Sequence, residues 1–386
     1  MAPPPKLIDD VTVEVLLCLP PAEPEHLFRA ALVCKPWLRV LCDPDFRRRY
    51  RAFHGAPPLL GLIPRRQAFD GYPAPRFAST TSMPDFPFPG AFDGHRARPL
   101  DCRHGRVLVQ VWHERRRKLE YLVWDPITGD RHDLPAPDFD WVIYIAAVFC
   151  ASDGCDHLDC HGGPFSVAFV AMATDLRKDI VKASAYSSET GAWSAPISLG
   201  DYAQHIRNAL YERLRYGPFA QGRRGPVIGD QVYFALRGGN EIIKYNLHGN
   251  CLSVINPPPH NAYEIALMVM EDSSLGFAHI ECCSLYLWSM KVDSQGVAEW
   301  VQRRVIKVET LVPTVDPSQG PFVVGSAEGL GVIFISAYAG LFTLDLKSEQ
   351  MRKVDEPGDY FNVLPYLSFY TPDRGRLLSL ARADDL

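Results

Sequence analysis

The cysteine and histidine side chains between residues 150 and 161 form the densest group in the chain that could bind a metal. The group comprises Cys150, Cys155, His157, Cys160 and His161. Thiolates and imidazoles are good zinc ligands. However, the spacing matches no common zinc module, and Asp153, Asp156 and Asp159 suit a solvated loop equally well. We therefore expect a loop between two strands, and we predict no metal site.

Other motifs that would indicate catalysis are missing from the sequence. It has no G-x-x-x-x-G-K-[ST] phosphate loop, no H-E-x-x-H zinc motif, no G-x-S-x-G nucleophile turn and no EF-hand loop. The His-Gly-Gly stretch at 161–163 is similar to the oxyanion loop of esterases, but no nucleophile turn accompanies it. The sequence therefore predicts no catalytic residue and no cofactor.

Composition and charge narrow the classes of partner. The 386 residues include 40 Lys and Arg against 45 Asp and Glu, which gives a net charge of −5. This balance argues against binding nucleic acid through a broad basic face. The basic runs at 47–51 and 115–118 are expected to be solvated.

The sequence also argues against insertion into a membrane and against export. The longest apolar run, at 141–151, is shorter than the roughly 20 residues that span a bilayer. The N-terminus lacks the apolar segment of a signal peptide. We therefore expect no membrane partner, reduced cysteines and a cytoplasmic or nuclear location.

Residues 7–54 have the pattern of short helices, whereas the remainder has the pattern of strands. Prolines at 20 and 21 end the first helix. The four helices are expected over 9–19, over 23–33, around Trp37, and from the cap at Asp43-Pro44 to Gly55. Four such helices bury little core, so this module is expected to dock on a partner or a neighbouring domain.

The helical region contains the pattern of a known docking motif. A Leu-Pro pair at 19–20 is followed about 13 residues later by Val-Cys-x-x-Trp at 33–37. These positions resemble the F-box, a helical motif that binds the Skp-type adaptor of cullin–RING ubiquitin ligases. The stretches 43–46 and 50–61 are similar to those of plant, especially grass, F-box proteins.

This resemblance implies an apolar surface that contacts the adaptor. The residues it implies are Leu16, Leu19, Pro20, Leu32, Val33, Cys34 and Trp37. An apolar face with an aromatic anchor suits helix-mediated docking. Alternatively, Leu32 and Trp37 only complete the core of the module, although four short helices have little room to bury the whole set.

Beyond residue 56 the chain repeats a pattern of hairpin, polar turn and further strand. Strands end near residues 124, 185, 244, 288 and 344, a period of ~55 residues that is typical of a β-propeller. An extra sheet is expected from 58–95 with a strand around 367–370. The pattern therefore predicts about six irregular, kelch-like blades, with a β-sandwich as the alternative.

These observations predict a multidomain α + β protein. The expected parts are an F-box domain at 1–55, an F-box-associated β-propeller-like domain at 56–375 and a C-terminal tail at 376–386. The resemblance to F-box-associated domains is best at 124–129, Trp-Asp-Pro-Ile-Thr-Gly. A short amphipathic helix is expected at 202–216.

The resemblance implies a non-catalytic substrate-recognition subunit of an SCF-type cullin–RING ubiquitin ligase. In it, the F-box binds the Skp-type adaptor and the β domain presents an unknown protein target. Two alternatives stay open, namely an F-box scaffold or small-molecule receptor without a ubiquitin role, and an enzyme built on a kelch-like propeller. The sequence names no target-binding residue.

Overall fold

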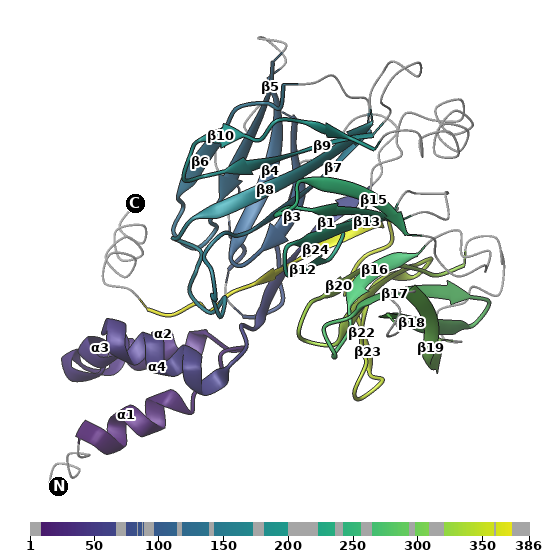
Figure 1. The fold of residues 1–386 in the computed structure, drawn as a ribbon. Helices are drawn as coiled ribbons and strands as arrows, with labels where there is room; N and C mark the ends of the chain where they lie inside the picture. The colour runs from purple at the N-terminus through teal and green to yellow at the C-terminus, as the bar shows by residue number, and fades with distance from the viewer. Residues whose placement is uncertain are drawn as a thin grey trace, which may run out of the picture.

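The computed structural model describes most of the chain. Its described residues are 9–66, 75–82, 84–86, 88, 96–113, 118–138, 143–172, 181–199, 223–235, 242–255, 265–292, 298–308, 320–358 and 360–372. Helices come first and strands follow (Figure 1). The helix expected at 202–216 and the tail at 376–386 lie outside the described residues. Within the described ranges, no helix is long and apolar enough to cross a bilayer.

The helical module follows the predicted pattern closely. Its helices are α1 (Asp9–Leu17), α2 (Glu25–Val33), α3 (Lys35–Leu41) and α4 (Pro44–His54). The Asp43 carboxylate accepts a hydrogen bond from the backbone N–H of Asp45 at 2.7 Å and caps α4. Gly55 ends α4 with a φ of 70°, a left-handed conformation that glycine adopts without a steric penalty. Both ends of α4 are therefore fixed by local sequence.

The core of the module is built around Tyr50, which is fully buried. Its hydroxyl donates a hydrogen bond of 2.7 Å to the carbonyl of Leu19, so the polar end of the ring is satisfied. The Nε2 atom of His54 lies 3.0 Å from the carbonyl of Leu17. These two contacts hold α4 against the end of α1 and the turn after it.

The strands form six antiparallel sheets. The first comprises β3 (Arg96–Arg103), β4 (Arg106–His113), β5 (Lys118–Trp124) and β6 (Arg131–Leu134). The second comprises β7 (Ile143–Cys150), β8 (Phe165–Met172), β9 (Val181–Ser187), β10 (Ala192–Trp193) and β11 (Ile197–Ser198). The third comprises β12 (Val227–Ile228), β13 (Gln231–Ala235), β14 (Ile242–Asn246) and β15 (Cys251–Ile255).

The other three sheets complete the set. The fourth comprises β16 (Ala266–Val269), β17 (Leu275–Glu281), β18 (Ser284–Val292) and β19 (Ala298–Lys307). The fifth comprises β20 (Phe322–Ala327), β21 (Val332–Ala337), β22 (Gly340–Asp345) and β23 (Met351–Asp355). The sixth comprises β1 (Leu59–Arg66), β2 (Ala78–Ser79) and β24 (Tyr360–Leu367).

The sheets contact one another in a closed ring. Strand β24 contacts β3, β3 contacts β7, and β11 contacts β15. Strand β13 contacts β16, β16 contacts β20, and β20 contacts β24, which returns to the starting sheet. The prediction of a six-bladed propeller is therefore confirmed, and the β-sandwich alternative is wrong.

The sixth blade joins segments from the two ends of the propeller. Strand β24 pairs antiparallel with β1, so that Ile63 lies opposite Leu364. The extra sheet expected from 58–95 with a C-terminal strand is thus present. Its C-terminal strand is β24 and not the segment around 367–370. Phe369, within that segment, packs instead in the core of the helical module.

The repeated turn after a strand has a repeated geometry. The Asp125 carboxylate accepts hydrogen bonds from the N–H groups of Ile127 and Thr128 at 2.8 and 3.2 Å. Asp345 accepts in the same way from Lys347 and Ser348 at 2.9 and 2.8 Å. An Asp side chain that bonds the backbone two residues ahead stabilises such a turn. The polar residues that punctuate the sequence repeat are therefore structural.

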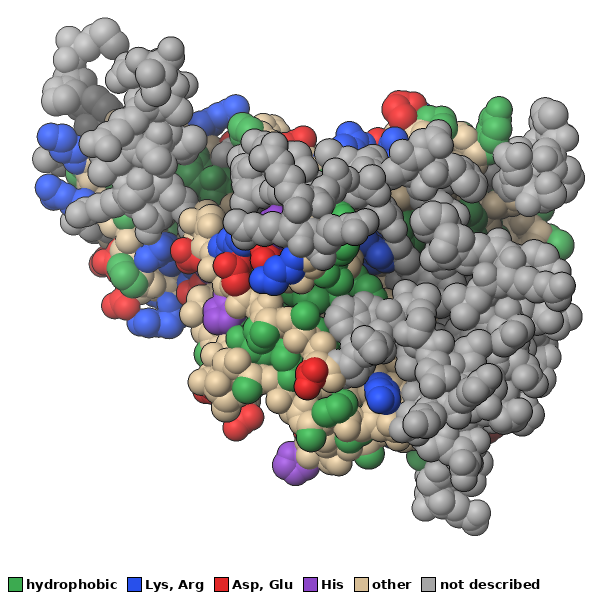
Figure 2. Space-filling view, turned by 90° about the horizontal axis from the view of Figure 1, so that it is seen from above, with side chains coloured by type: hydrophobic (Ala, Val, Ile, Leu, Met, Phe, Trp, Pro, Cys, Tyr) green, Lys and Arg blue, Asp and Glu red, His purple; other side chains and the backbone are tan. Residues whose placement is uncertain are grey.

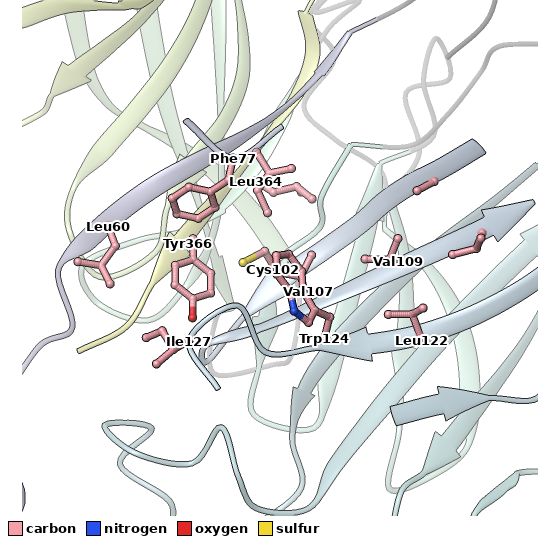
Figure 3. Close-up of a cluster of buried hydrophobic side chains, with 13 residues drawn as sticks. Leu60, Phe77, Cys102, Val107, Val109, Leu122, Trp124, Ile127, Leu364 and Tyr366 are labelled. Carbon is pink, nitrogen blue, oxygen red and sulfur yellow. The ribbon is translucent and has the colours of Figure 1, made fainter. Parts of the chain in front are cut away.

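Apolar side chains fill the spaces between blades. Between the sixth and first blades, the cluster of Figure 3 brings Phe77 and Leu364 together with Cys102, Val107 and Trp124. All five are at most 3% exposed. Trp124, the first residue of the best repeat, is therefore a packing residue.

A buried ion network links the innermost strands. Asp101 and Arg103 on β3 pair with each other, and their side chains are 0% and 1% exposed. Arg224 lies 3.1 Å from Asp101 and 2.9 Å from Glu328, which directly follows β20. Asp101 also accepts the N–H of Val148 on β7 at 2.8 Å. Groups from four blades therefore meet in one buried network. Removing one charged partner is costly because the opposite charge then stays buried without it.

Candidate functional site

The helical module exposes an unusual share of apolar side chains. In the described part of the molecule, nine large hydrophobic residues are exposed, and five belong to this module. They are Val11, Val15, Leu32, Val33 and Phe53. Exposed apolar residues gathered on a small module mark a surface that a partner covers. The module surface is therefore the candidate functional site.

Part of this surface is the outer face of α1. Val11, Val15 and Cys18 follow one another at the spacing of a helical stripe, and they line a shallow open depression of about 340 Å³. Val11 and Val15 are 44% and 53% exposed. Asp10 and Glu14 flank them. This face combines an apolar floor with acidic edges.

A second part lies where α2 ends. Leu32 and Val33 are 77% and 64% exposed at the last turn of α2. Cys34 then adopts an extended conformation, with φ −162° and ψ 159°, and α3 begins directly after it. This abrupt break leaves no following turn to cover the two apolar side chains. The Leu-Val-Cys sequence therefore forms a projecting apolar corner.

The structure divides the residues implied for adaptor binding into three groups. Leu32, Val33 and Pro20 are exposed, whereas Leu19, Cys34 and Trp37 are half-buried. Leu16 is only 1% exposed and belongs to the core of the module. The expectation that Leu16 contributes to the exposed surface is therefore corrected, because its side chain packs inside the module.

Val11, Val15 and Phe53 are absent from the implied set although they are exposed. The sequence of α1 contains a pattern that indicates the exposure of the two valines. Helix α1 buries Leu16 and Leu17, and Val11 and Val15 form a second apolar stripe on the same helix. A short helix with two apolar stripes presents more apolar surface than one neighbour covers.

The basic run on α4 is paired. Arg48 lies 2.6 Å from Asp45, and Arg49 lies 2.9 Å from Glu14. Arg51 pairs with Asp159, which belongs to the second blade. Of the second basic run, only Lys118 is described, and it lies 2.9 Å from Glu120. On the face seen in Figure 2, the described basic and acidic side chains are interspersed.

The opposite side of the module rests on the propeller. The rings of Phe28 and Tyr370 lie 4.9 Å apart, and those of Tyr50 and Phe369 lie 6.1 Å apart. The chain leaves β24 and runs to the helices, as Figure 1 shows. Leu158, from the loop between β7 and β8, packs on the same core. The module therefore presents its exposed apolar faces while its inner side is held by two propeller segments.

The propeller has a depression of its own between the fifth and sixth blades. It measures about 470 Å³, and its lining includes Thr80, Thr343, Asp345, Ser348 and Arg352. This lining of mixed polar and apolar side chains offers hydrogen-bonding groups without an evident catalytic pair. A surface that binds a target stays a prediction for this domain.

Comparisons with known proteins cover most of the chain. The family model described as "F-box protein AT5G49610-like, beta-propeller" matches residues 99–373. The chain is 27% identical over 308 residues to the F-box protein At5g03970 of Arabidopsis thaliana, covering 76% of this chain and 67% of that protein.

Similar solved structures are more distant. A chain of a nidogen/laminin complex has a TM-score of 0.41 and 10% identity, over 80% of this chain and 98% of its own. TolB from Acinetobacter baumannii has a TM-score of 0.40 and 12% identity, over 83% and 70%. The family match covers more than half of the chain and agrees with the six-bladed ring. The chain therefore belongs to the F-box proteins with an AT5G49610-like β-propeller.

Proposed function

We propose that this protein is a non-catalytic substrate-recognition subunit of an SCF-type cullin–RING ubiquitin ligase in the cytoplasm or nucleus. In this proposal the helical module binds a Skp-type adaptor and the propeller binds a protein target. The observation that supports it is the exposed apolar surface on the N-terminal helical module of a chain that belongs to the F-box proteins. F-box proteins are generally adaptors without catalysis of their own.

The geometry suits docking at the corner formed by Leu32 and Val33. Both side chains project from the end of α2, and the half-buried indole of Trp37 follows on α3. Apolar residues beside an aromatic anchor typically carry most of the binding energy at an interface. Covering this corner removes apolar area from water without any change in the core.

The attachment of the module to the propeller suits the presentation of a target. A ligase gains rate by holding its target close to the loaded conjugating enzyme, which turns a bimolecular step into an effectively unimolecular one. This gain needs a firm connection between the docking and target-binding parts. The contacts of Phe28 with Tyr370 and of Arg51 with Asp159 provide such a connection.

The test is binding of the purified full chain to a plant Skp-type adaptor, measured by calorimetry. Leu32→Glu/Val33→Glu should raise the Kd at least ~30-fold, as expected when about 2 kcal/mol of hot-spot energy is lost. Both side chains are exposed, so the variant should fold. Tyr338→Glu, at a 70% exposed site on the propeller, is the matched control and should bind normally. No binding by the folded wild type at micromolar concentrations would overturn the proposal.

A second assay separates a ligase subunit from a scaffold. The chain is combined with adaptor, cullin–RING core, conjugating enzyme and ubiquitin, and ubiquitin attached to its own lysines is measured. A ligase subunit should be modified in the wild type and much less in Leu32→Glu/Val33→Glu. Adaptor binding without any such transfer would favour the scaffold alternative.

A further inference from the structure

We propose that Cys150, Cys155, His157 and Cys160 bind one zinc ion that fixes the loop between β7 and β8. The ligand atoms of these four side chains all lie within 4.8 Å of one another. The sequence alone favours a solvated loop over a zinc site, because the spacing of these residues matches no common zinc module. The fold brings the four ligand atoms close together, although their spacing in the sequence does not indicate a zinc site.

The distances fit a tetrahedral site. The Sγ atom of Cys160 lies 3.7 Å from Nδ1 of His157. Zinc bonds of about 2.3 Å to sulfur and 2.0–2.1 Å to nitrogen put the sulfur–nitrogen edge of a tetrahedron at roughly 3.5 Å and the sulfur–sulfur edge at roughly 3.8 Å. The ligand atoms all lie within 4.8 Å of one another, so a contraction of at most about 1 Å brings them to these edge lengths. Three thiolates and one imidazole form a closed ligand set that is typical of a structural zinc ion.

The backbone is arranged for this coordination. Cys150 ends β7, and the other three ligands lie in the loop before β8. His157 has a φ of 59°, a left-handed conformation that is uncommon for a residue other than glycine. This conformation turns the chain so that His157 reaches Cys160 three residues later. Coordination of the imidazole would stabilise a backbone that is otherwise unfavourable.

Two of the sulfurs accept backbone hydrogen bonds. The N–H of Ser152 points to Sγ of Cys150, and the N–H of His157 points to Sγ of Cys155, both at 3.4 Å. In each case the donor is two residues beyond the cysteine. Outer hydrogen bonds of this kind orient and tune metal ligands.

A buried cation balances the charge. Zinc with three thiolates carries a net charge of −1. Arg106 is 2% exposed, and its guanidinium donates hydrogen bonds to the carbonyls of Cys160 and of Gly163, the latter at 2.7 Å. It therefore holds a positive charge against the loop that carries the ligands. Burial of a single cation is favourable only where an opposite charge lies nearby.

Neighbouring histidines have other roles. The His104 ring stacks on His157 with centroids 4.0 Å apart and an angle of 5°, and its Nδ1 accepts the N–H of Cys150 at 3.2 Å. His104 therefore positions two of the ligands. His161 has both ring nitrogens engaged, at 2.6 Å from Asp125 and 3.2 Å from Asp159. The site is complete without His161.

The loop fixed by the proposed zinc ion also contacts the helical module. Leu158 lies between His157 and Cys160 and packs on the core of the module. Asp159, next in the chain, pairs with Arg51 of α4. A metal ion here would therefore stiffen one of the two segments that join the module to the propeller. This inference does not depend on what the module binds.

The experiment measures metal bound by the full chain. The protein is purified under reducing conditions with added zinc, dialysed against a weak chelator and analysed by mass spectrometry for metals. We expect one zinc ion per chain. Cys155→Ser/Cys160→Ser should retain less than a tenth of it. Cys282→Ser/Cys283→Ser changes two cysteines outside the cluster and is the matched control, which should keep the full content.

A second measurement uses the wild type alone, so that it does not depend on how a variant folds. Replacement of zinc by cobalt should give the visible absorption of a tetrahedral cobalt–thiolate centre, and zinc should abolish it. The inference is overturned if the wild type retains no more zinc than Cys155→Ser/Cys160→Ser. It is equally overturned if the cobalt spectrum is that of a hydrated ion, or if the reduced cysteines bind no metal.

Discussion

The helical module and the propeller distribute apolar and charged groups in opposite ways. The module exposes five large hydrophobic side chains within residues 9–54, whereas the much longer described propeller exposes four. The propeller instead buries charges, with Asp101 and Arg103 almost inaccessible on its inner strands. One region leaves apolar side chains exposed to water, and the other buries charged side chains that pair with one another.

This difference separates two sources of stability. The propeller is held by closure of its ring and by the network around Asp101, all within one domain. The module is held by a small core that includes Phe369, a residue from the far end of the chain. Disturbing the ring should therefore affect both regions, whereas disturbing the contact of Phe369 should affect the module alone.

The largest expected effect follows from Leu364→Asp in β24. Leu364 is fully buried between the sixth and first blades, so an unpaired carboxylate there should cost at least ~5 kcal/mol and prevent ring closure. Chemical unfolding followed by tryptophan fluorescence measures the loss. Val292→Asp, at a 59% exposed strand end, is the control and should change stability by less than ~0.5 kcal/mol. A cooperative, wild-type-like transition in Leu364→Asp would contradict the role of closure.

A smaller and local effect is expected from Phe369→Ala. The side chain is 4% exposed, and truncation of a buried phenylalanine costs about 3 kcal/mol. Hydrogen exchange should become faster in α2 and α4 while the propeller strands keep their protection. If β3 and β7 lost protection to the same extent, the two regions would not be separable in this way.

The ion network gives a pH-dependent prediction. Burial alone would raise the pKa of Glu328, but Arg103 and Arg224 outweigh it and lower the pKa to about 2. The folded-state pKa lies below the unfolded value, so the stabilisation is present above about pH 4.5 and is lost as the pH falls towards 2.

Glu328→Gln should therefore destabilise the chain by about 2 kcal/mol at pH 7, because it removes one of the two carboxylates that pair with Arg103 and Arg224. This difference should shrink as the pH falls below 4.5, which urea unfolding at several pH values measures. Glu349→Gln serves as the control, since that carboxylate is 54% exposed beside Arg304. A gap between wild type and Glu328→Gln that stays constant down to pH 3 would contradict the pairing.

The smallest effect on stability is expected from Leu32→Glu/Val33→Glu. Both side chains are already in water, so the free energy of unfolding should change by no more than ~0.5 kcal/mol. The melting temperature should therefore stay close to that of the wild type. Differential scanning calorimetry measures it. Strong destabilisation would show that the corner supports the core, and the contrast between the two regions would weaken.

Local features could be predicted from the sequence. The cap at Asp43, the glycine end of α4 and the turn at Asp125 each depend on contacts within about four residues, so their signal lies in a short stretch. The number of blades followed from a repeated turn pattern for the same reason. Even the closing blade was anticipated, although its last strand lies a few residues earlier than expected.

Long-range contacts could not be predicted. Arg224 meets Asp101 and Glu328 only because the ring places three distant segments at its inner strands. The convergence of Cys150 with His157 depends on how the loop turns, which residue spacing does not specify. Leu16 and Val15 are neighbours of similar character, and only the packing of α2 to α4 decides that one is buried and the other exposed.

The pairing of β1 with β24 also governs the order in which the protein can mature during synthesis. The module and the first strand leave the ribosome early, but the partner strand and Phe369 emerge only after residue 359. Until then the ring has an open edge and the helices lack part of their core. A chain that stops prematurely therefore has neither a closed ring nor a complete helical module.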